Sequence, residues 1–358
     1  MAITKHELIN KIQQGITIEA EDLTNLDLSN TNIGGANFSE CDFTGCNLAH
    51  SQIEQVNLIN CNISQANLAS SKWIDCNLIE CTIEESNLSE IHFTDINVIQ
   101  SSLKKSNFQN SQLQETNFVE CSAAQSSFQS CDLTFASFMQ CDLSAANVSM
   151  CNLERTNFIE CDLMGINLRD SRMQQSIFEK PTIENHDFSG MHLAMTQFRS
   201  AVLNGCNFSK SDLTQTAFVE AELNNCTFDQ ANIPLGLFTD STLTQSSLKN
   251  CFMEQASLQA CNLNGCDFTG SHLLQAQMND TQCLATKFNG CELSYSDLSM
   301  AICRHTDFSN TALFRANLHG LVDSGSIWSG SSKSLALGTD DKLEKAQHWK
   351  PTPVITET

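Results

Sequence analysis

The segment CDLSAANVSMCNLERTNFIEC, residues 141–161, repeats one arrangement of residues every five positions. An apolar residue stands at Leu143 and returns at Val148, Leu153 and Phe158, and a small residue precedes each of them by two positions. A cysteine also occurs at every tenth position of the segment. The cysteines therefore have three candidate roles: metal ligands, disulfides, or packing residues of a repeated fold.

The five-residue period extends far beyond this segment. From Leu23 to Leu318 it gives 60 positions without an insertion, and 57 of them are Leu, Phe, Ile, Val, Met or Trp. Two positions earlier, 51 of the 60 residues are Ala, Ser, Thr, Cys or Gly, and one position earlier 30 of 60 are Asn or Asp. A helix has a period of about 3.6 and a strand a period of about 2, so neither explains the pattern. A backbone that turns a corner after each unit does, with four units closing one square coil.

The repeated unit resembles the A(D/N)LXX motif of the pentapeptide-repeat family, as in ANLAS at 66–70 and CNLNG at 261–265. The resemblance covers residues 21–320 and implies an all-β fold, a right-handed quadrilateral β-helix. About 15 coils stacked at about 4.8 Å would form a rod roughly 70 Å long. The apolar centre and the small residue then point inward, and the two variable residues point outward.

The two ends depart from the repeat, which predicts three parts. Residues 1–20 form an N-terminal capping helix and lead-in, because Thr4 and Glu7 match a capping box before an apolar helical face. Residues 21–320 form the β-helix. Residues 321–358 form a C-terminal cap or a flexible tail, in which a tryptophan, at position 328 or 349, is expected to plug the final coil. The tail also leaves open a homodimer through an end of the rod.

A coil of twenty residues stacks positions twenty apart, and the apolar centres then sort into columns. The principal core column is phenylalanine in seven successive coils. A second, mixed column of Phe and aliphatic residues occupies the opposite face. Core packing is the interpretation of both, and each buried centre contributes roughly 1.5–3 kcal/mol of gross transfer free energy. The principal core column comprises Phe118, Phe138, Phe158, Phe178, Phe198, Phe218 and Phe238.

The cysteines follow the same register. Of the 18 cysteines, all but Cys283 and Cys303 occupy the small inward position, and those two occupy centres. Their spacings of five, ten and twenty belong to the repeat, whereas structural zinc sites use closely paired cysteines. We therefore interpret the thiols as small buried side chains, with metal ligation and disulfides as the weaker alternatives. The sequence predicts no cofactor and no metal site.

One outward column alternates acids with amides. It can be a solvated face, or an acidic stripe that a basic partner recognises. Its carboxylates stand roughly 10 Å apart, so all of them can stay ionised. We name it the acid–amide column: Glu40, Asn60, Glu80, Gln100, Glu120, Gln140 and Glu160, of which the four glutamates are candidate partner-binding residues.

The column ends at Lys180, where residues that break the pattern gather. Pro181, His186 and Met191 stand at positions that elsewhere hold small residues. A proline removes a backbone donor, so a local distortion is expected at about 175–195. The region is a second candidate partner site or a tolerated irregularity. Its candidate residues are Arg169, Arg172, Lys180, His186 and Arg199.

Composition and charge bear on which partners the protein can bind and where in the cell it acts. The formal charge of −22 argues against direct nucleic-acid binding, since phosphates attract Lys and Arg. The amino-terminal residues lack the apolar run of a signal peptide, and no stretch approaches the roughly 18 apolar residues of a membrane span. We expect a cytoplasmic protein without membrane insertion.

These features favour a binding role over catalysis. A filled solenoid leaves no cleft for a small substrate, and the residues form no recognisable catalytic set. We predict a non-enzymatic scaffold, an acidic rod whose outward side chains bind a protein partner. The family resemblance keeps two alternatives open: a DNA-mimicking regulator of a type II topoisomerase such as gyrase, and a bacterial secretion-associated component, either an effector or part of type VI secretion.

Overall fold

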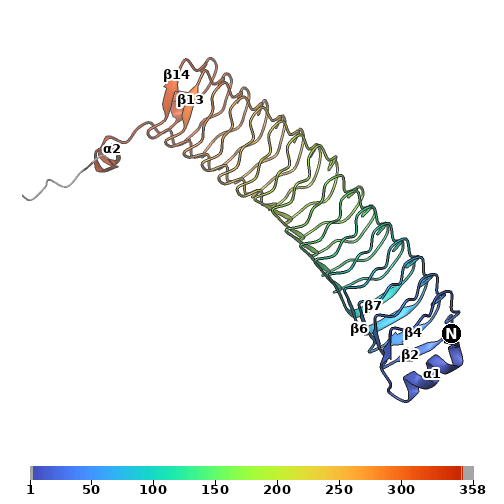
Figure 1. Cartoon of the computed structure of the whole chain (residues 1–358). Helices are drawn as coiled ribbons and strands as arrows, with labels where there is room; N and C mark the ends of the chain where they lie inside the picture. Colours follow the sequence, from blue (N-terminus) through green and yellow to red (C-terminus); the bar gives the residue numbers. More distant parts are fainter. Residues whose placement is uncertain (1–2, 348, 350–358) are drawn as a thin grey trace, which may run out of the picture.

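The chain forms one long curved rod of stacked coils (Figure 1). The structure, a computed structural model, describes residues 3–347 and 349. Short strands and single β-bridges, all parallel, connect successive coils. The predicted β-helix is confirmed. Its elements are α1 (Lys5–Gln13), β1 (Ile18–Glu19), β2 (Asn32–Gly34), β3 (Asn37–Ser39), β4 (Gln52–Glu54), β5 (Asn57–Ile59), β6 (Lys72–Ile79), β7 (His92–Ile99), β8 (Asn117–Val119), β9 (Ser137–Met139), β10 (Asn157–Ile159), β11 (Ile177–Glu179), β12 (Gln197–Arg199), β13 (Ile302–Arg304), β14 (Val322–Ser324), the 3₁₀ helix η1 (Lys333–Leu335) and α2 (Asp341–Gln347).

The coil contains twenty residues, as the spacing of the columns predicts. Phe158 pairs with Phe138 on one side and with Phe178 on the other, each twenty residues away. The corners lie at residues whose numbers are multiples of five, and these have positive φ, for example 53° at Glu80 and 69° at Gly190. A left-handed backbone costs roughly 1–2 kcal/mol for a residue other than glycine. Hydrogen bonds to the next coil, such as Glu80 N to Ile99 O at 2.9 Å, hold these corners in place.

The centres fill the bore of the rod. The rings of Phe138, Phe158 and Phe178 stack nearly parallel, with centroids 5.2 and 4.7 Å apart. The second column meets the first edge-on, as Phe128 and Phe138 show at 5.9 Å. All seven residues of the principal core column are buried. The tight packing follows from the alternation of a large centre with a small residue two positions earlier.

Helix α1 lies at the amino-terminal end of the rod (Figure 1). Thr4 and Glu7 form the predicted capping box, in which the Thr4 side chain accepts from Glu7 N and the Glu7 carboxylate accepts from Thr4 N. Leu8 is fully buried in the core of the first coils. The first coil begins slightly earlier than the repeat pattern indicates, since β1 already pairs with β3 through Ile18 and Phe38.

The coil register continues past Gly320, where the repeat pattern ends. β13 pairs with β14, and a further bridge joins Asn317 to Leu337. Backbone hydrogen bonds do not require an apolar centre, so the ladder persists although Asp323 replaces one. Trp328 stacks on Phe308 at 4.1 Å and covers the end of the core. Trp349 is 71% exposed and has no such role.

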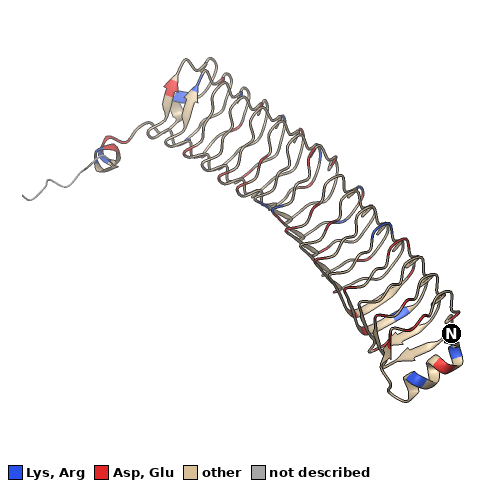
Figure 2. Ribbon diagram, in the orientation of Figure 1, with Lys and Arg blue, Asp and Glu red and all other residues tan. Residues whose placement is uncertain are grey.

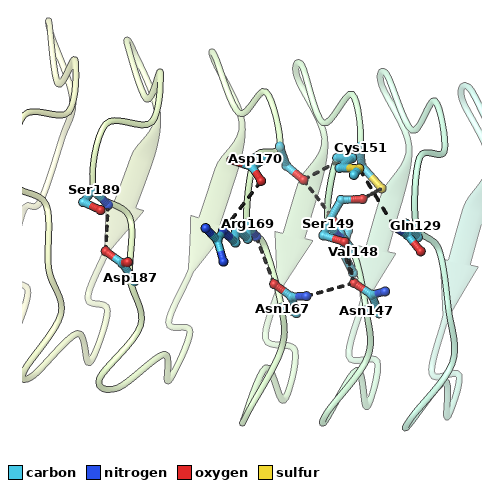
Figure 3. A network of polar contacts seen from close by, with 12 residues as sticks. Gln129, Asn147, Val148, Ser149, Cys151, Asn167, Arg169, Asp170, Asp187 and Ser189 are labelled. Atoms are coloured by element: carbon cyan, nitrogen blue, oxygen red, sulfur yellow. Dashed lines mark hydrogen bonds and ion pairs between the residues drawn. The ribbon is translucent and has the colours of Figure 1, made fainter.

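In the described chain, the ladder of backbone hydrogen bonds between successive coils is interrupted at one place, and only on part of the coil. Within the described chain, no β-bridge or backbone hydrogen bond joins residues 162–173 to residues 182–192, and we call this region the ladder break. Figure 3 shows the Asn147–Asn167 hydrogen bond on one side and Asp187 with Ser189 beyond the break. The coils stay joined through β11 and β12. These strands follow the inner side of the curve in Figure 1, so the break opens toward the outer side.

Two residues that depart from the repeat lie beside the break, and both stand where the distortion is predicted. Pro181 has no N–H, but in the described chain its column neighbours Cys161 and Ala201 donate no corner bond either, so the proline removes no bond between coils. His186 brings an imidazole into a position built for a small side chain. Together with Ile166 one coil earlier, the bulk of this side chain is what separates the two coils.

Candidate functional site

The acid–amide column lies outward along the corner that follows the principal core column. Its members are linked in places by side-chain hydrogen bonds between coils: Gln100 Nε2 donates to Glu120 Oε2 at 2.8 Å, and Gln140 Nε2 donates to Glu160 Oε2 at 3.2 Å. Each amide thus shields one carboxylate from the next. The result is a row of solvent-facing carboxylates held at a fixed spacing.

Lys180 terminates this row. Its Nζ donates to Glu160 Oε1 at 3.1 Å. This hydrogen bond, helped by that from Gln140 and by the lysine charge, lowers the pKa of Glu160 below its ordinary value. Acidic residues are nevertheless spread over the whole rod (Figure 2). Charge alone therefore does not single out this column, whereas its ordered spacing does.

An aliphatic column lies beside the acid–amide column, and the sequence analysis missed it. Ile59 and Met139 are 43% and 41% exposed, and the other members are half-buried. The signal was present in the sequence as aliphatic residues at intervals of twenty, one position before each member of the acid–amide column from Asn60 to Glu160. The aliphatic column comprises Ile59, Ile79, Ile99, Val119, Met139 and Ile159.

An asparagine ladder borders the aliphatic column on its other side. Asn57 Nδ2 donates to Asn37 Oδ1 at 2.8 Å, and the same bond recurs up to Asn117, which donates to Asn97 at 3.1 Å. The ladder consists of Asn37, Asn57, Asn77, Asn97 and Asn117. Since these side chains bond to one another, they form a fixed polar border rather than a set of mobile groups.

The basic residues near the ladder break do not form one cluster. Arg169 lies 3.7 Å from its neighbour Asp170. Arg172 follows on the next face of the coil, while Lys180 and Arg199 belong to the corner and strand beside the principal core column. The structure therefore brings only Lys180 and Arg199 onto the same face. A groove of about 480 Å³ opens at this corner, lined by Glu160, Cys161, Asp162, Met164, Lys180 and Thr182.

His186 is half-buried, with its ring against the core. Its ring packs against Phe188 with centroids 4.4 Å apart. Its Nε2 is buried and has no hydrogen-bond partner among the described residues. Burial lowers the pKa of His186, because the charged imidazolium would lose its hydration.

All 18 cysteines are free and buried. Many thiols donate to a carbonyl of the preceding coil, as Cys151 Sγ does to Phe128 O at 2.8 Å. Within residues 3–347 and 349, no three His, Cys, Asp or Glu side chains are grouped so as to hold a metal ion. Burial raises the pKa of Cys46 to about 11 and that of Cys206 to about 12.

We expect the native protein to resist thiol labelling. The thiolate is the reactive form, and burial both keeps the reagent away from the sulfur and raises the pKa of most of these thiols. A chromogenic disulfide reagent should label less than about one thiol per chain in native buffer, and all 18 in guanidinium under reducing pretreatment. Rapid native labelling of several thiols would contradict the packing role.

Among the described residues, the cavity found inside the bore is too small for a substrate. A cavity of about 10 Å³ lies among Ile33, Phe38 and Trp73 and is about the size of one water molecule. Within the described part of the chain, no helix has the combined length and hydrophobicity that a membrane span requires.

Several solved structures resemble the chain at low sequence identity. Full-length QnrB1, a plasmid-mediated fluoroquinolone resistance protein, is 17% identical; the match covers 48% of this chain and 86% of QnrB1, with a TM-score of 0.29. HetL, a pentapeptide repeat protein involved in heterocyst differentiation regulation in Nostoc sp. strain PCC 7120, is 16% identical; 94% of this chain and 98% of HetL are covered, with a TM-score of 0.12. No curated protein matches the chain in sequence.

Family profiles match the repeat itself. A profile described as Pentapeptide repeat region matches residues 131–208. The profile described as Pentapeptide repeats (8 copies) matches residues 22–60, 61–98, 106–144, 196–233, 237–275 and 287–321. These segments make up more than half of the chain and coincide with the stacked coils. The chain therefore belongs to the pentapeptide-repeat family.

Proposed function

We propose that the protein is a non-enzymatic scaffold whose acid–amide column binds a basic surface of a protein partner. The observation that carries the proposal is the ordered row of carboxylates, held in register by Gln100 and Gln140. A rigid array of like charges at fixed spacing raises the rate of association with a complementary surface and fixes its register. The filled bore supports binding rather than catalysis, and we place this role in the cytoplasm.

DNA mimicry is the second candidate, favoured by the net charge of −22 on a rod-shaped molecule. The charge spacing favours the scaffold instead. Carboxylates of the acid–amide column recur every second coil, roughly 10 Å apart, whereas DNA carries one phosphate per about 3.4 Å of each strand. A gyrase surface that binds DNA phosphates at their natural spacing would meet too few carboxylates along this column.

Charge reversal tests the scaffold. A triple variant with Glu80, Glu120 and Glu160 each replaced by Lys should retain less than about a tenth of the partner captured from a lysate of the source cells. The three side chains are solvent-facing, so the melting temperature should stay within a few degrees of the parent. Quantitative mass spectrometry of the captured proteins and a thermal melt provide the two measurements.

A matched variant controls for net charge. Glu85, Glu90 and Glu115 occupy equivalent corner positions on other columns. Replacing these three by Lys changes the charge equally and should leave capture intact. Equal loss in both variants would show that only the overall charge matters, and unchanged capture in the first would remove the acid–amide column from the binding site. Inhibition of gyrase supercoiling by the parent protein, abolished only in the first variant, would favour DNA mimicry.

A further inference from the structure

The exposed aliphatic column is an unusual surface for a parallel sheet. Parallel sheets are commonly covered on both faces, and their aliphatic residues are then buried. Here the core covers the inner face of strands β5 to β10. Ile59, Ile99 and Met139 lie on the outer face of these strands in a straight row. The equivalent position on the preceding face of the same coil is polar in most coils, as Thr94, Gln114 and Thr134 illustrate.

The column has definite ends and sides. It runs from Ile59 to Ile159, five steps of about 4.8 Å or roughly 24 Å in all. At the next coil Glu179 takes the aliphatic position and Lys180 takes the acidic one, so the surface stops at the ladder break. The asparagine ladder, continued by Ser137 and Asn157, and the acid–amide column form its two polar borders. A partner must therefore combine a narrow apolar strip with one cationic edge.

We propose that this surface binds an amphipathic α-helix that lies along the rod, with its apolar stripe on the aliphatic column and Lys or Arg side chains over Glu80, Glu120 and Glu160. This inference rests on the proposed function and names the partner's structure. A helix of about 16 residues spans roughly 24 Å.

The rise of one helical turn is similar to the spacing between successive coils of the rod. One helical turn rises about 5.4 Å, close to the coil spacing of about 4.8 Å, so successive turns meet successive aliphatic residues. Glutamates of the acid–amide column recur every second coil, roughly 10 Å apart, and a cation at every seventh residue of a helix recurs at about 10.5 Å. A partner strand is less suitable, because strands add to sheet edges, whereas this surface is a sheet face.

A synthetic peptide of about 18 residues serves as the probe, with Leu at helical intervals on one face, Lys at every seventh position beside it, and Ala elsewhere. Fluorescence anisotropy should show binding that weakens at least about tenfold in Ile99→Asp. The control is Thr94→Asp, which lies on the same strand β7 at the equivalent position of the preceding face. It should change the affinity less than about twofold.

The pair of variants separates apolar contact from charge. Both add one negative charge, and general electrostatic attraction would make both bind the cationic probe more tightly. Only an apolar contact at Ile99 makes the first variant weaker. A probe with Glu in place of Lys should bind at least about tenfold more weakly to the parent protein. Circular dichroism checks that each variant is folded. If Ile99→Asp is misfolded, Met139→Asp replaces it as the test, because Met139 is 41% exposed.

The outcomes distinguish this inference from the proposed function. Equal effects of Ile99→Asp and Thr94→Asp would overturn helix binding, even if charge reversal of the acid–amide column still abolishes partner capture. A parent dimer that Ile99→Asp dissociates in light scattering would also overturn it, because a second copy of the chain would then cover the column. Probe binding that depends on Ile99 but not on Glu80, Glu120 and Glu160 would instead contradict the acidic column as a recognition element.

Discussion

Replacing Phe158 by Ala is expected to lower the free energy of unfolding by about 3–5 kcal/mol. The ring is fully enclosed between Phe138 and Phe178, whose centroids lie 5.2 and 4.7 Å away. Strand β10, which carries Phe158, is paired with β9 and β11 on its two sides, so it cannot collapse into the space that the ring leaves. A urea titration followed by circular dichroism measures the change.

An exposed phenylalanine provides the control. Phe135 is 48% exposed and packs under the Arg155 guanidinium, 5.2 Å from the ring centroid. Phe135→Ala should cost less than about 1 kcal/mol, the range of an exposed cation–π contact. If the two variants were equally stable, the principal core column would not carry the stability that its burial indicates.

Amide hydrogen exchange is expected to reveal the ladder break as a local weak point. In the coil before it, the amides of Leu143, Ala145 and Val148 donate to the next coil at 2.8 Å. The equivalent amides of Leu163, Gly165 and Leu168 have no acceptor in the described chain. We expect these three to exchange at least about a hundredfold faster, since they need no opening of a hydrogen bond. Hydrogen–deuterium exchange resolved by residue, at constant pH, makes the comparison.

A substitution sharpens this test. Pro181→Ser removes the proline ring and introduces the residue that the same column holds at Ser101 and Ser241. Combined with His186→Ser, which returns a small residue to the bore, it should slow exchange at Leu163 and Leu168 toward that of Leu143 and Val148. Unchanged exchange in the double variant would mean that another feature separates the coils.

Most of the fold was predictable because the information is local and repeated. A centre such as Phe158 and its partner small residue Thr156 belong to the same unit, and every unit contacts copies of itself. The same spacing of twenty placed the acid–amide column on one corner. The aliphatic column follows the same spacing of twenty. A pattern of charges does not reveal it, because its residues are uncharged.

The arrangement of the basic residues was not predictable in the same way. Arg169, Arg172 and Lys180 are close in the sequence, yet the coil turns a corner between each of them, so they face different directions. His186, a candidate contact residue, is half-buried, and its ring packs against Phe188, where the imidazole is poorly solvated. Proximity along the chain therefore overestimated proximity on the surface.

The sequence by itself determined the twenty-residue coil, the inward and outward positions, and the columns that run along the rod, because a strict period leaves only one way to bury its apolar residues. Only the tertiary structure decided where the ladder opens, how the rod curves, and that one more coil follows Gly320. These features depend on hydrogen bonds between two coils. Whether such bonds form is set by the fit of residues twenty positions apart, as Ile166 and His186 show, and not by the pattern within either coil.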